Sequence, residues 1–182
     1  ERLERELGQY REEEATCNGC AGYPKYDQVT GLLSFNRFRE EVDSVIASGK
    51  GKSCLLVYTD LENFKYFNRK YGYAAGDQLL REFTGYIIDT LKKRNTAHFT
   101  RVVADQFILF FEEKWNNGSI EAIKRINNGF IERQQRKYPE AKLRLRTGVY
   151  KVEKDCDGAS FAIDAANYAR RQIQDNSPET VC

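Results

Sequence analysis

Two aspartates, Asp60 and Asp105, have the residue type and the sequence context of a metal site. Asp60 follows a short apolar run, 54–59, that is typical of a buried strand, and Asp105 lies between two further predicted strands. If these strands are neighbours, both carboxylates project from one end of a sheet. Carboxylate oxygens suit Mg²⁺, and an ion held there could bridge phosphate groups. Aspartate is also common in turns and at strand ends, so the pair alone leaves a purely structural role open.

The elements that must position these acids alternate between helices and strands. Apolar residues at helical spacing predict helices over 34–46, 64–71, 79–91, 120–135 and 159–173. Extended patterns predict strands over 54–59, 97–103, 107–112 and 142–152, and 180–182 could open a final edge strand. The second and third strands are close enough to form a hairpin. We therefore expect an α+β fold with helices packed on a mostly antiparallel sheet.

The first 25 residues differ from the rest of the chain. Leu3, Leu7 and Tyr10 form one narrow apolar stripe among Glu and Arg, which predicts a helix that pairs with another helix. A solvated, frayed terminus is the alternative. Glycine and proline then mark a linker. We expect a helical lead-in and linker over 1–25 and one domain over 26–182; because the chain starts at Glu1 and lacks methionine, we also expect it to be part of a longer protein.

Composition excludes several classes of function. The 182 residues are 41% apolar, enough for one domain core, and 29 basic residues nearly balance 27 acidic ones. This balance does not point to nucleic acid or a membrane surface, and no apolar run reaches the roughly 20 residues of a spanning helix. Cys17 and Cys20 form a C-x-x-C pair, but His98 is the sole histidine and no second pair could complete a zinc shell. We expect reduced thiols in a cytoplasmic domain.

Five short motifs follow one another over almost the whole chain. They are Asp27-Gln-Val-Thr-Gly-Leu32, Asp60-Leu-Glu-Asn-Phe-Lys65 with Asn68, Gly72-Tyr-Ala-Ala-Gly-Asp77, Arg101-Val-Val-Ala-Asp-Gln-Phe107 and Tyr168-Ala-Arg-Arg171. They resemble D-x-L-T-G-L, D-h-D-x-F-K-x-x-N, G-H-x-x-G-D, R-x-G-G-D-E-F and Y-x-A-K of GGDEF domains, which make or sense cyclic di-GMP. Each motif is modest alone, but their order and separations are hard to obtain by chance.

The resemblance implies a cyclase-palm fold related to the ferredoxin-like βαββαβ arrangement. An active member binds one GTP per protomer, and two protomers facing each other in a homodimer join the nucleotides with the help of Mg²⁺. On this resemblance Asp60, the Leu61 carbonyl and Asp105 would hold metal, and Asp60 and Asp105 would be the catalytic acids.

The resemblance also implies a nucleotide site. Asn68 and Asp77 match the pair that reads the guanine edge. The backbone of Asn63, Phe64 and Lys65 matches the turn that binds the β- and γ-phosphates at a helix N-terminus. Arg171 stands where the family has a phosphate-binding lysine. Each residue also has an ordinary structural reading: Asn68 and Asp77 as helix caps, Phe64 as core and Lys65 as a solvated side chain.

The signature loop departs from the pattern. It reads Val103, Ala104, Asp105, Gln106 and Phe107, so both glycines and the glutamate are replaced. Glycine allows a positive φ in a tight hairpin and a close approach of ligand to backbone, whereas valine tolerates neither easily. We therefore expect Val103 to crowd or reshape the hairpin, and Gln106 removes a charge.

Other positions depart as well. Arg94 keeps the arginine of the family's R-x-x-D inhibitory site, but Ala97 replaces its aspartate, so we expect weak feedback binding. Asp175 falls near the place of a second phosphate-binding arginine. The first motif also lacks its usual N-R and continues with Ser34-Phe35.

These losses predict a degenerate GGDEF domain: a GTP-binding regulatory module with little or no cyclase activity, similar to those that accompany an EAL phosphodiesterase domain. An attached or partner EAL or sensor domain would be its target. An active diguanylate cyclase with an atypical signature, and a purely structural dimerisation module, are the two alternatives.

Overall fold

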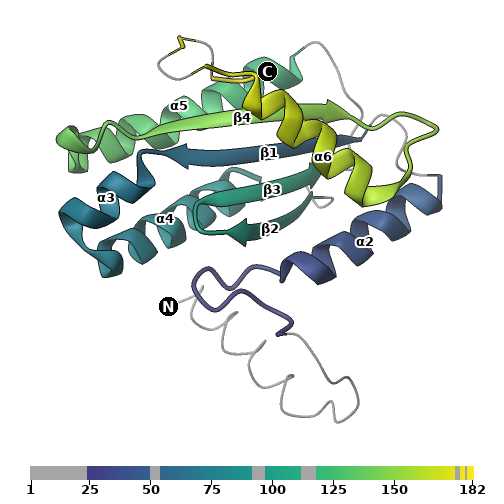
Figure 1. The fold of residues 1–182 in the computed structure, drawn as a ribbon, viewed down its shortest axis with the longest axis horizontal. Helices are drawn as coiled ribbons and strands as arrows, with labels where there is room; N and C mark the ends of the chain where they lie inside the picture. Colours follow the sequence, from purple (N-terminus) through teal and green to yellow (C-terminus); the bar gives the residue numbers. More distant parts are fainter. Residues whose placement is uncertain (1–23, 50–53, 92–96, 112–117, 175–176, 179) are drawn as a thin grey trace.

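The computed structural model describes residues 24–49, 54–91, 97–111, 118–174, 177–178 and 180–182. A four-stranded antiparallel sheet has the order β2-β3-β1-β4 (Figure 1). Its strands are β1 (Leu55–Glu62), β2 (Ala97–Val103), β3 (Gln106–Phe111) and β4 (Arg144–Lys151). The helices are α2 (Phe35–Ala47), α3 (Phe64–Tyr71), α4 (Tyr73–Leu91), α5 (Ser119–Lys137) and α6 (Gly158–Arg171), with a short 3₁₀ helix, η2 (Pro139–Ala141).

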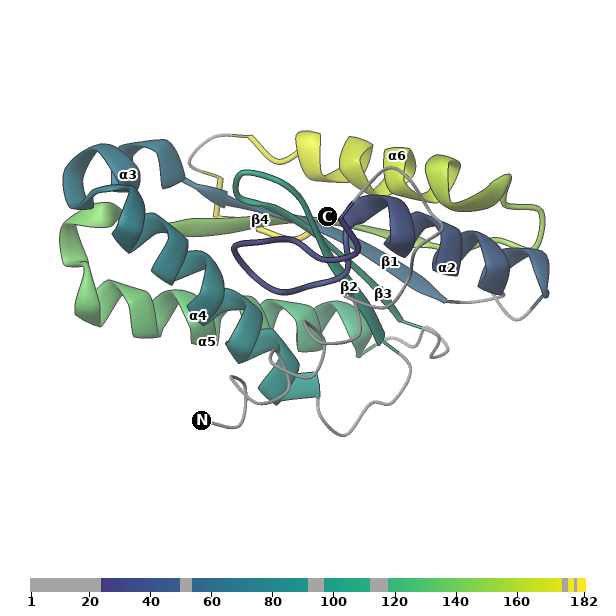
Figure 2. The same ribbon diagram turned by 90° about the horizontal axis from the view of Figure 1, so that it is seen from below.

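Helices cover both faces of the sheet. Helices α2 and α6 lie on one face, and α4 and α5 lie on the other (Figure 2). From β1 to β4 the order is strand, two helices, strand, strand, helix, strand, which is the ferredoxin-like βαββαβ arrangement with α3 and α4 in the place of its first helix. The predicted α+β class and cyclase-palm fold are therefore confirmed.

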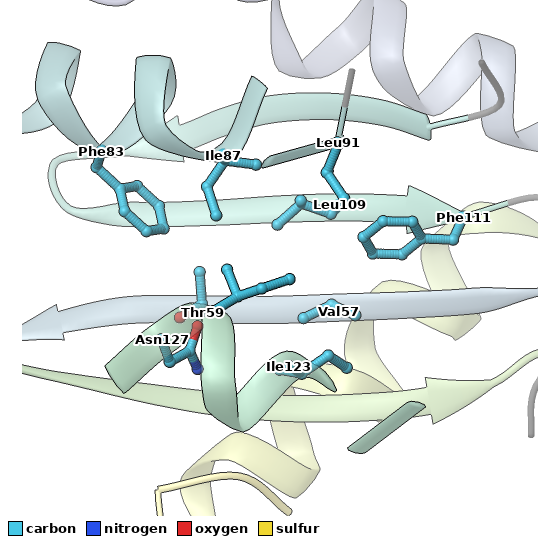
Figure 3. Close-up of a pocket in the computed structure, with 10 residues that line it drawn as sticks. Val57, Thr59, Phe83, Ile87, Leu91, Leu109, Phe111, Ile123 and Asn127 are labelled. Atoms are coloured by element: carbon cyan, nitrogen blue, oxygen red, sulfur yellow. The ribbon is translucent and has the colours of Figure 1, made fainter. Parts of the chain in front are cut away.

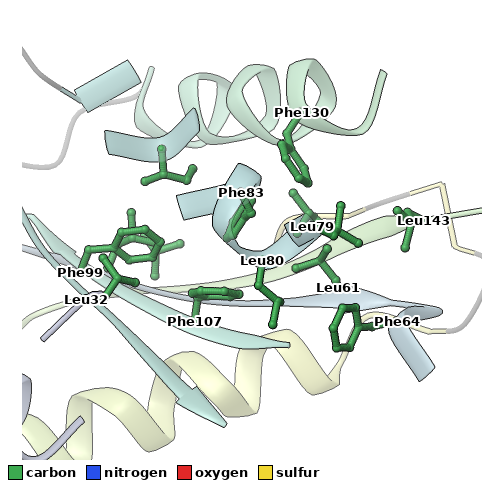
Figure 4. Packing of buried hydrophobic residues seen from close by; sticks show 14 of the residues in the cluster. Leu32, Leu61, Phe64, Leu79, Leu80, Phe83, Phe99, Phe107, Phe130 and Leu143 are labelled. Carbon is green, nitrogen blue, oxygen red and sulfur yellow. The ribbon is translucent and has the colours of Figure 1, made fainter. Parts of the chain in front are cut away.

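The core on the α4 and α5 face is aromatic at its centre (Figure 4). The ring of Phe83 on α4 lies 4.9 Å from that of Phe107 and 5.0 Å from that of Phe130, centroid to centroid. Edge-on contacts of this kind stabilise a core beyond the area that they bury. Because strand residues alternate, Val57 and Leu61 of β1 face this cluster while Leu56 and Tyr58 face α2 and α6.

A cavity of about 30 Å³ remains between α4, α5 and the sheet (Figure 3). Its lining is apolar except for Thr59 and Asn127. The Oγ1 atoms of Thr59 and Thr147 are 2.8 Å apart, and Asn127 donates its Nδ2 hydrogen to Thr147 Oγ1 at 2.8 Å. These polar groups are already hydrogen-bonded, so the cavity offers a ligand mainly apolar contact.

Strand β1 is longer than the sequence predicts, and the end of the chain pairs with the sheet. Strand β1 continues through Asp60 to Glu62, where the sequence predicts an end at Asp60. The strand can continue because Asp60 lies between β3 and β4 and finds polar partners there. The segment 180–182 pairs in parallel with β4 through a bridge between Thr147 and Val181, as predicted for an edge. Among the described residues, no helix is both long and apolar enough to cross a membrane.

Candidate functional site

The candidate site begins with a row of residues across the sheet at the end of β1. Asp60 is paired with Gln106 of β3 on one side and with Arg146 of β4 on the other, and Gln106 in turn faces Val103 of β2. Residues directly opposite each other in a sheet project on the same face. The row therefore lies on the face that α2 and α6 cover.

Asp60 is bound by two arginines. Arg146 donates from Nε to Oδ1 at 3.3 Å and from Nη2 to Oδ2 at 3.0 Å, while Arg170 of α6 donates from Nη1 to Oδ2 at 2.5 Å. The side chains of Asp60 and Arg170 are each only 8% exposed, and that of Arg146 is 23% exposed. A buried carboxylate requires such cationic partners, because removing an unpaired charge from water destabilises the folded protein.

Arg170 is held from other directions as well. It donates from Nε and Nη2 to Asn167 Oδ1 at 3.0 and 2.8 Å, and its guanidinium lies 5.3 Å from the centre of the Tyr58 ring. Helix α6 can bring it so close because β4 has Gly148 beneath the helix. A Cβ there would lie 2.0 Å from the carbonyl oxygen of Ala166 and 2.2 Å from the nitrogen of Arg170.

The signature hairpin turns at Ala104 and Asp105. Ala104 has a φ of 49°, the left-handed conformation that glycine adopts without a side-chain penalty. Val103 ends β2 and is 59% exposed, next to a register shift between Arg101 and itself. The backbone strain thus falls on Ala104, and whether Val103 crowds a ligand stays a prediction.

Arg101 ties this hairpin to the first motif. Its Nε donates to the Ala104 carbonyl at 2.7 Å, and its Nη1 lies 3.3 Å from both carboxylate oxygens of Asp27. Burial would raise the pKa of Asp27, but hydrogen bonds from Thr30 and the charge of Arg101 outweigh it and lower that pKa. The carboxylate of Asp27 is therefore an anchor for the turn.

The two acids singled out from the sequence do come together. Burial raises the pKa of Asp105 and outweighs its own backbone N–H, which lowers that pKa; the nearby charge of Asp60 raises it as well, against smaller opposite effects of Arg170 and Arg146. The Asp105 carbonyl also accepts a hydrogen bond from Leu61 N at 3.3 Å. Gln106, at the position of the signature glutamate, accepts the hydroxyl of Tyr58 at 2.6 Å.

The corner between α3 and α4 contains the predicted base-reading residues. Gly72 ends α3 with a φ of 88°. Glycine is needed at position 76 for α4 to approach the Asn68 side chain of α3, because a Cβ there would lie 1.8 Å from Asn68 Oδ1. That oxygen is buried and has no hydrogen-bond partner among the described residues, and Asp77 follows Gly76 directly. Asp77 is half-buried, and its carboxylate can accept hydrogen bonds from a ligand that presents donors.

The predicted phosphate turn begins at Asn63. Its φ is 70°, its Nδ2 donates to the Lys142 carbonyl at 2.7 Å, and it makes no side-chain cap on α3. The first N–H groups of α3 therefore lack that cap, as an anion-binding turn requires. Phe64 is buried in the core and Lys65 is exposed. Arg171 is exposed, whereas its neighbour Arg170 points inward.

Several predicted positions lie outside the described residues. They are Arg94 of the inhibitory remnant, Asp175, the helical lead-in, and Cys17 and Cys20.

The residues present do not fit the Mg²⁺ that the resemblance implies. The carboxylate of Asp60, which would bind the ion, accepts hydrogen bonds from two guanidinium groups instead. Within the described ranges, no group of three or more His, Cys, Asp or Glu side chains is placed to hold a metal ion.

Arg146 and Arg170 are the residues that sequence reasoning missed. Two signals were present. The run Leu143-Arg144-Leu145-Arg146 alternates, so if the leucines face the core, the arginines face the site. Arg170 also stands where the Y-x-A-K motif has alanine, which places a long cation beside the sheet.

The fold is a palm-type α+β domain, with the predicted base-reading residues at the corner between α3 and α4 and the two acids at the end of β1 and in the hairpin. A family model described as "Diguanylate cyclase, GGDEF domain" matches residues 24–178. The chain belongs to the GGDEF family, the domain family of cyclic di-GMP signalling.

Related proteins agree with this membership. The chain is 32% identical over 89 residues to diguanylate cyclase DgcS of Shewanella oneidensis and 28% identical over 130 residues to cyclic di-GMP phosphodiesterase PdeR of Escherichia coli. These matches cover 48% and 71% of the chain but only 29% and 18% of the two relatives.

Solved structures share the fold. The GGDEF domain of DgcB from Caulobacter crescentus, in complex with c-di-GMP, superposes with a TM-score of 0.69 at 18% identity, covering 85% of this chain and 92% of that one. The FimX GGDEF domain from Pseudomonas aeruginosa has a TM-score of 0.62 at 18% identity, with coverage of 82% and 93%.

Proposed function

We propose that this domain is a regulatory GGDEF module that binds a guanine nucleotide and makes little or no cyclic di-GMP. The observation that carries the proposal is a contrast between the two ends of the site. The predicted base-reading corner keeps Asn68 packed closely on Gly76, with the half-buried Asp77 next in the chain. The catalytic end has its acid Asp60 bound by arginines and its signature residue Gln106 bound to Tyr58.

Base selectivity follows from the chemistry of Asp77. A carboxylate can accept the N1 and N2 hydrogens of guanine, whereas adenine presents an acceptor at N1 and no N2 donor. An unpaired buried polar group costs about 1–3 kcal/mol, which corresponds to about one to two decades of preference for GTP over ATP.

The nucleotide would signal to another domain rather than react. PdeR is named a phosphodiesterase, and this chain matches only a small part of it. This supports an attached or partner EAL phosphodiesterase, or a sensor domain, as the target of the signal. A homodimer of facing protomers belongs to the same proposal.

Calorimetric titration with GTP and ATP, followed by product analysis, tests the proposal. We expect GTP to bind more tightly than ATP, no accumulation of cyclic di-GMP, and loss of the preference in Asp77→Ala. Sustained product formation that Asp60→Ala abolishes would establish an active cyclase instead. Absence of GTP binding would leave the dimerisation module as the better account.

A further inference from the structure

The carboxylates around Asp60 are balanced by guanidinium groups, which is not the charge distribution of a metal site. Asp60 pairs with Arg146 and Arg170, and Glu62 lies 3.3 Å from Arg144, its neighbour across the sheet. With Asp105, three carboxylates thus lie among three guanidinium groups. A site that attracts a divalent cation has uncompensated negative charge, and this one does not.

We infer that Arg146 and Arg170 take the place of the divalent metal, so that the Asp60 corner binds no Mg²⁺ and a bound nucleotide is held without it. An ion on Asp60 would lie beside both guanidinium groups and would have to displace their hydrogen bonds. Its repulsion from the two cations would oppose binding.

Arg170 is fixed in place by several groups, and the strand register sets the position of Arg146. Arg170 is held by Asn167, by the Tyr58 ring and by the close packing of α6 on Gly148. Arg146 lies opposite Asp60 by the register of β1 with β4. A metal could not be accommodated by a rotamer change of one long side chain, because the backbone of α6 positions the second cation.

That the Asp60 corner binds no Mg²⁺ does not depend on nucleotide binding. That a nucleotide binds without Mg²⁺ rests on the proposed function. Phosphate is attracted by exposed cations, and the buried Arg170 is not one of them. Arg171, which follows it on the last turn of α6, is exposed and can meet a triphosphate directly. The charge that a metal supplies in an active member would here come from the protein.

Mn²⁺ alone, followed by electron paramagnetic resonance, tests the metal half. We expect no Mn²⁺ binding by the wild type that depends on Asp60. Replacing both cations, Arg146→Thr with Arg170→Ala, should increase Mn²⁺ affinity by at least about tenfold, because it removes two charges beside the ligand. Arg171→Ala is the matched control: it deletes a neighbouring arginine and leaves the contacts of Asp60 intact.

Wild-type binding of Mn²⁺ that disappears in Asp60→Asn would overturn the inference, and so would a folded double variant that still binds none. If the double variant does not fold, the wild type and Asp60→Asn still decide the question. For the nucleotide half, a fluorescent GTP analogue should bind with the same affinity, within about twofold, in EDTA and in Mg²⁺, and a tenfold gain with Mg²⁺ would refute it. No GTP binding under either condition would defeat the proposed function and leave the Mn²⁺ result unaffected.

Discussion

Removing the carboxylate of Asp60 should lower the stability of this domain. In an open pair of acids, deleting one member relieves repulsion and does not destabilise the fold. Here Asp60→Ala leaves Arg170 buried at 8% exposure next to Arg146, with no anion between them. Breaking a buried pair by removing one partner typically costs about 3–5 kcal/mol.

The structure reduces that figure. Arg146 is 23% exposed and can turn toward solvent, and Arg170 keeps Asn167 and the Tyr58 ring. We therefore expect a loss of about 2–4 kcal/mol for Asp60→Ala. Arg170→Ala should cost less, about 1–2 kcal/mol, because Asp60 remains paired with Arg146.

Urea unfolding followed by circular dichroism measures both losses, without metal or nucleotide. The Asp60→Ala loss corresponds to a fall in melting temperature of about 5–15 °C. Glu140→Ala is the control, because it removes an exposed ion pair with Lys70 and should change little. An Asp60→Ala variant as stable as the wild type, or more stable, would refute the reasoning that the two arginines compensate this carboxylate.

Three further substitutions test the geometry around the site. Gly148→Ala should cost about 1–3 kcal/mol in urea unfolding, because its Cβ would clash with the α6 backbone; unchanged stability would contradict that close packing. Ala104→Gly should raise stability by up to about 1 kcal/mol by relieving the positive φ, and a loss would show that the turn is unstrained. Asp105→Asn should raise the melting temperature at neutral pH, because the folded protein raises the pKa of Asp105 and so penalises its charged form. That gain should vanish below the ordinary pKa of 3.8, where the wild-type carboxyl is protonated in both states, and a gain that persists there would have another cause.

The elements were predictable because apolar periodicity determines which residues enter the core. The helix 64–71 and the strand 97–103 have the bounds that the sequence predicts. The end of β1 was not predictable in this way. A charged residue such as Asp60 reads as a strand terminator until its neighbours on both sides of the sheet are known.

The positions of candidate site residues were predictable only where these residues belong to a recognisable motif. The close approach of Gly76 to Asn68 gives a physical reason for the second glycine of its motif. The arginine pair on Asp60 depends on strand register and on where α6 lies, and neither follows from periodicity. The hydrogen bond from Tyr58 to Gln106 likewise needs the pairing of β1 with β3.

The presence of Asp60 is therefore no argument for a metal in this domain. Burying Asp60 alone would destabilise the fold, and so would burying Arg170 alone. Asp60 instead forms ion pairs with both Arg170 and Arg146, which offset the cost of burying the charges. The corner of the predicted base-reading residues has a different basis, because Gly72 and Gly76 shape it through the backbone of α3 and α4. We therefore expect the two parts of the candidate site to change independently, so that an altered charge around Asp60 leaves the close contact between Asn68 and Gly76 in place.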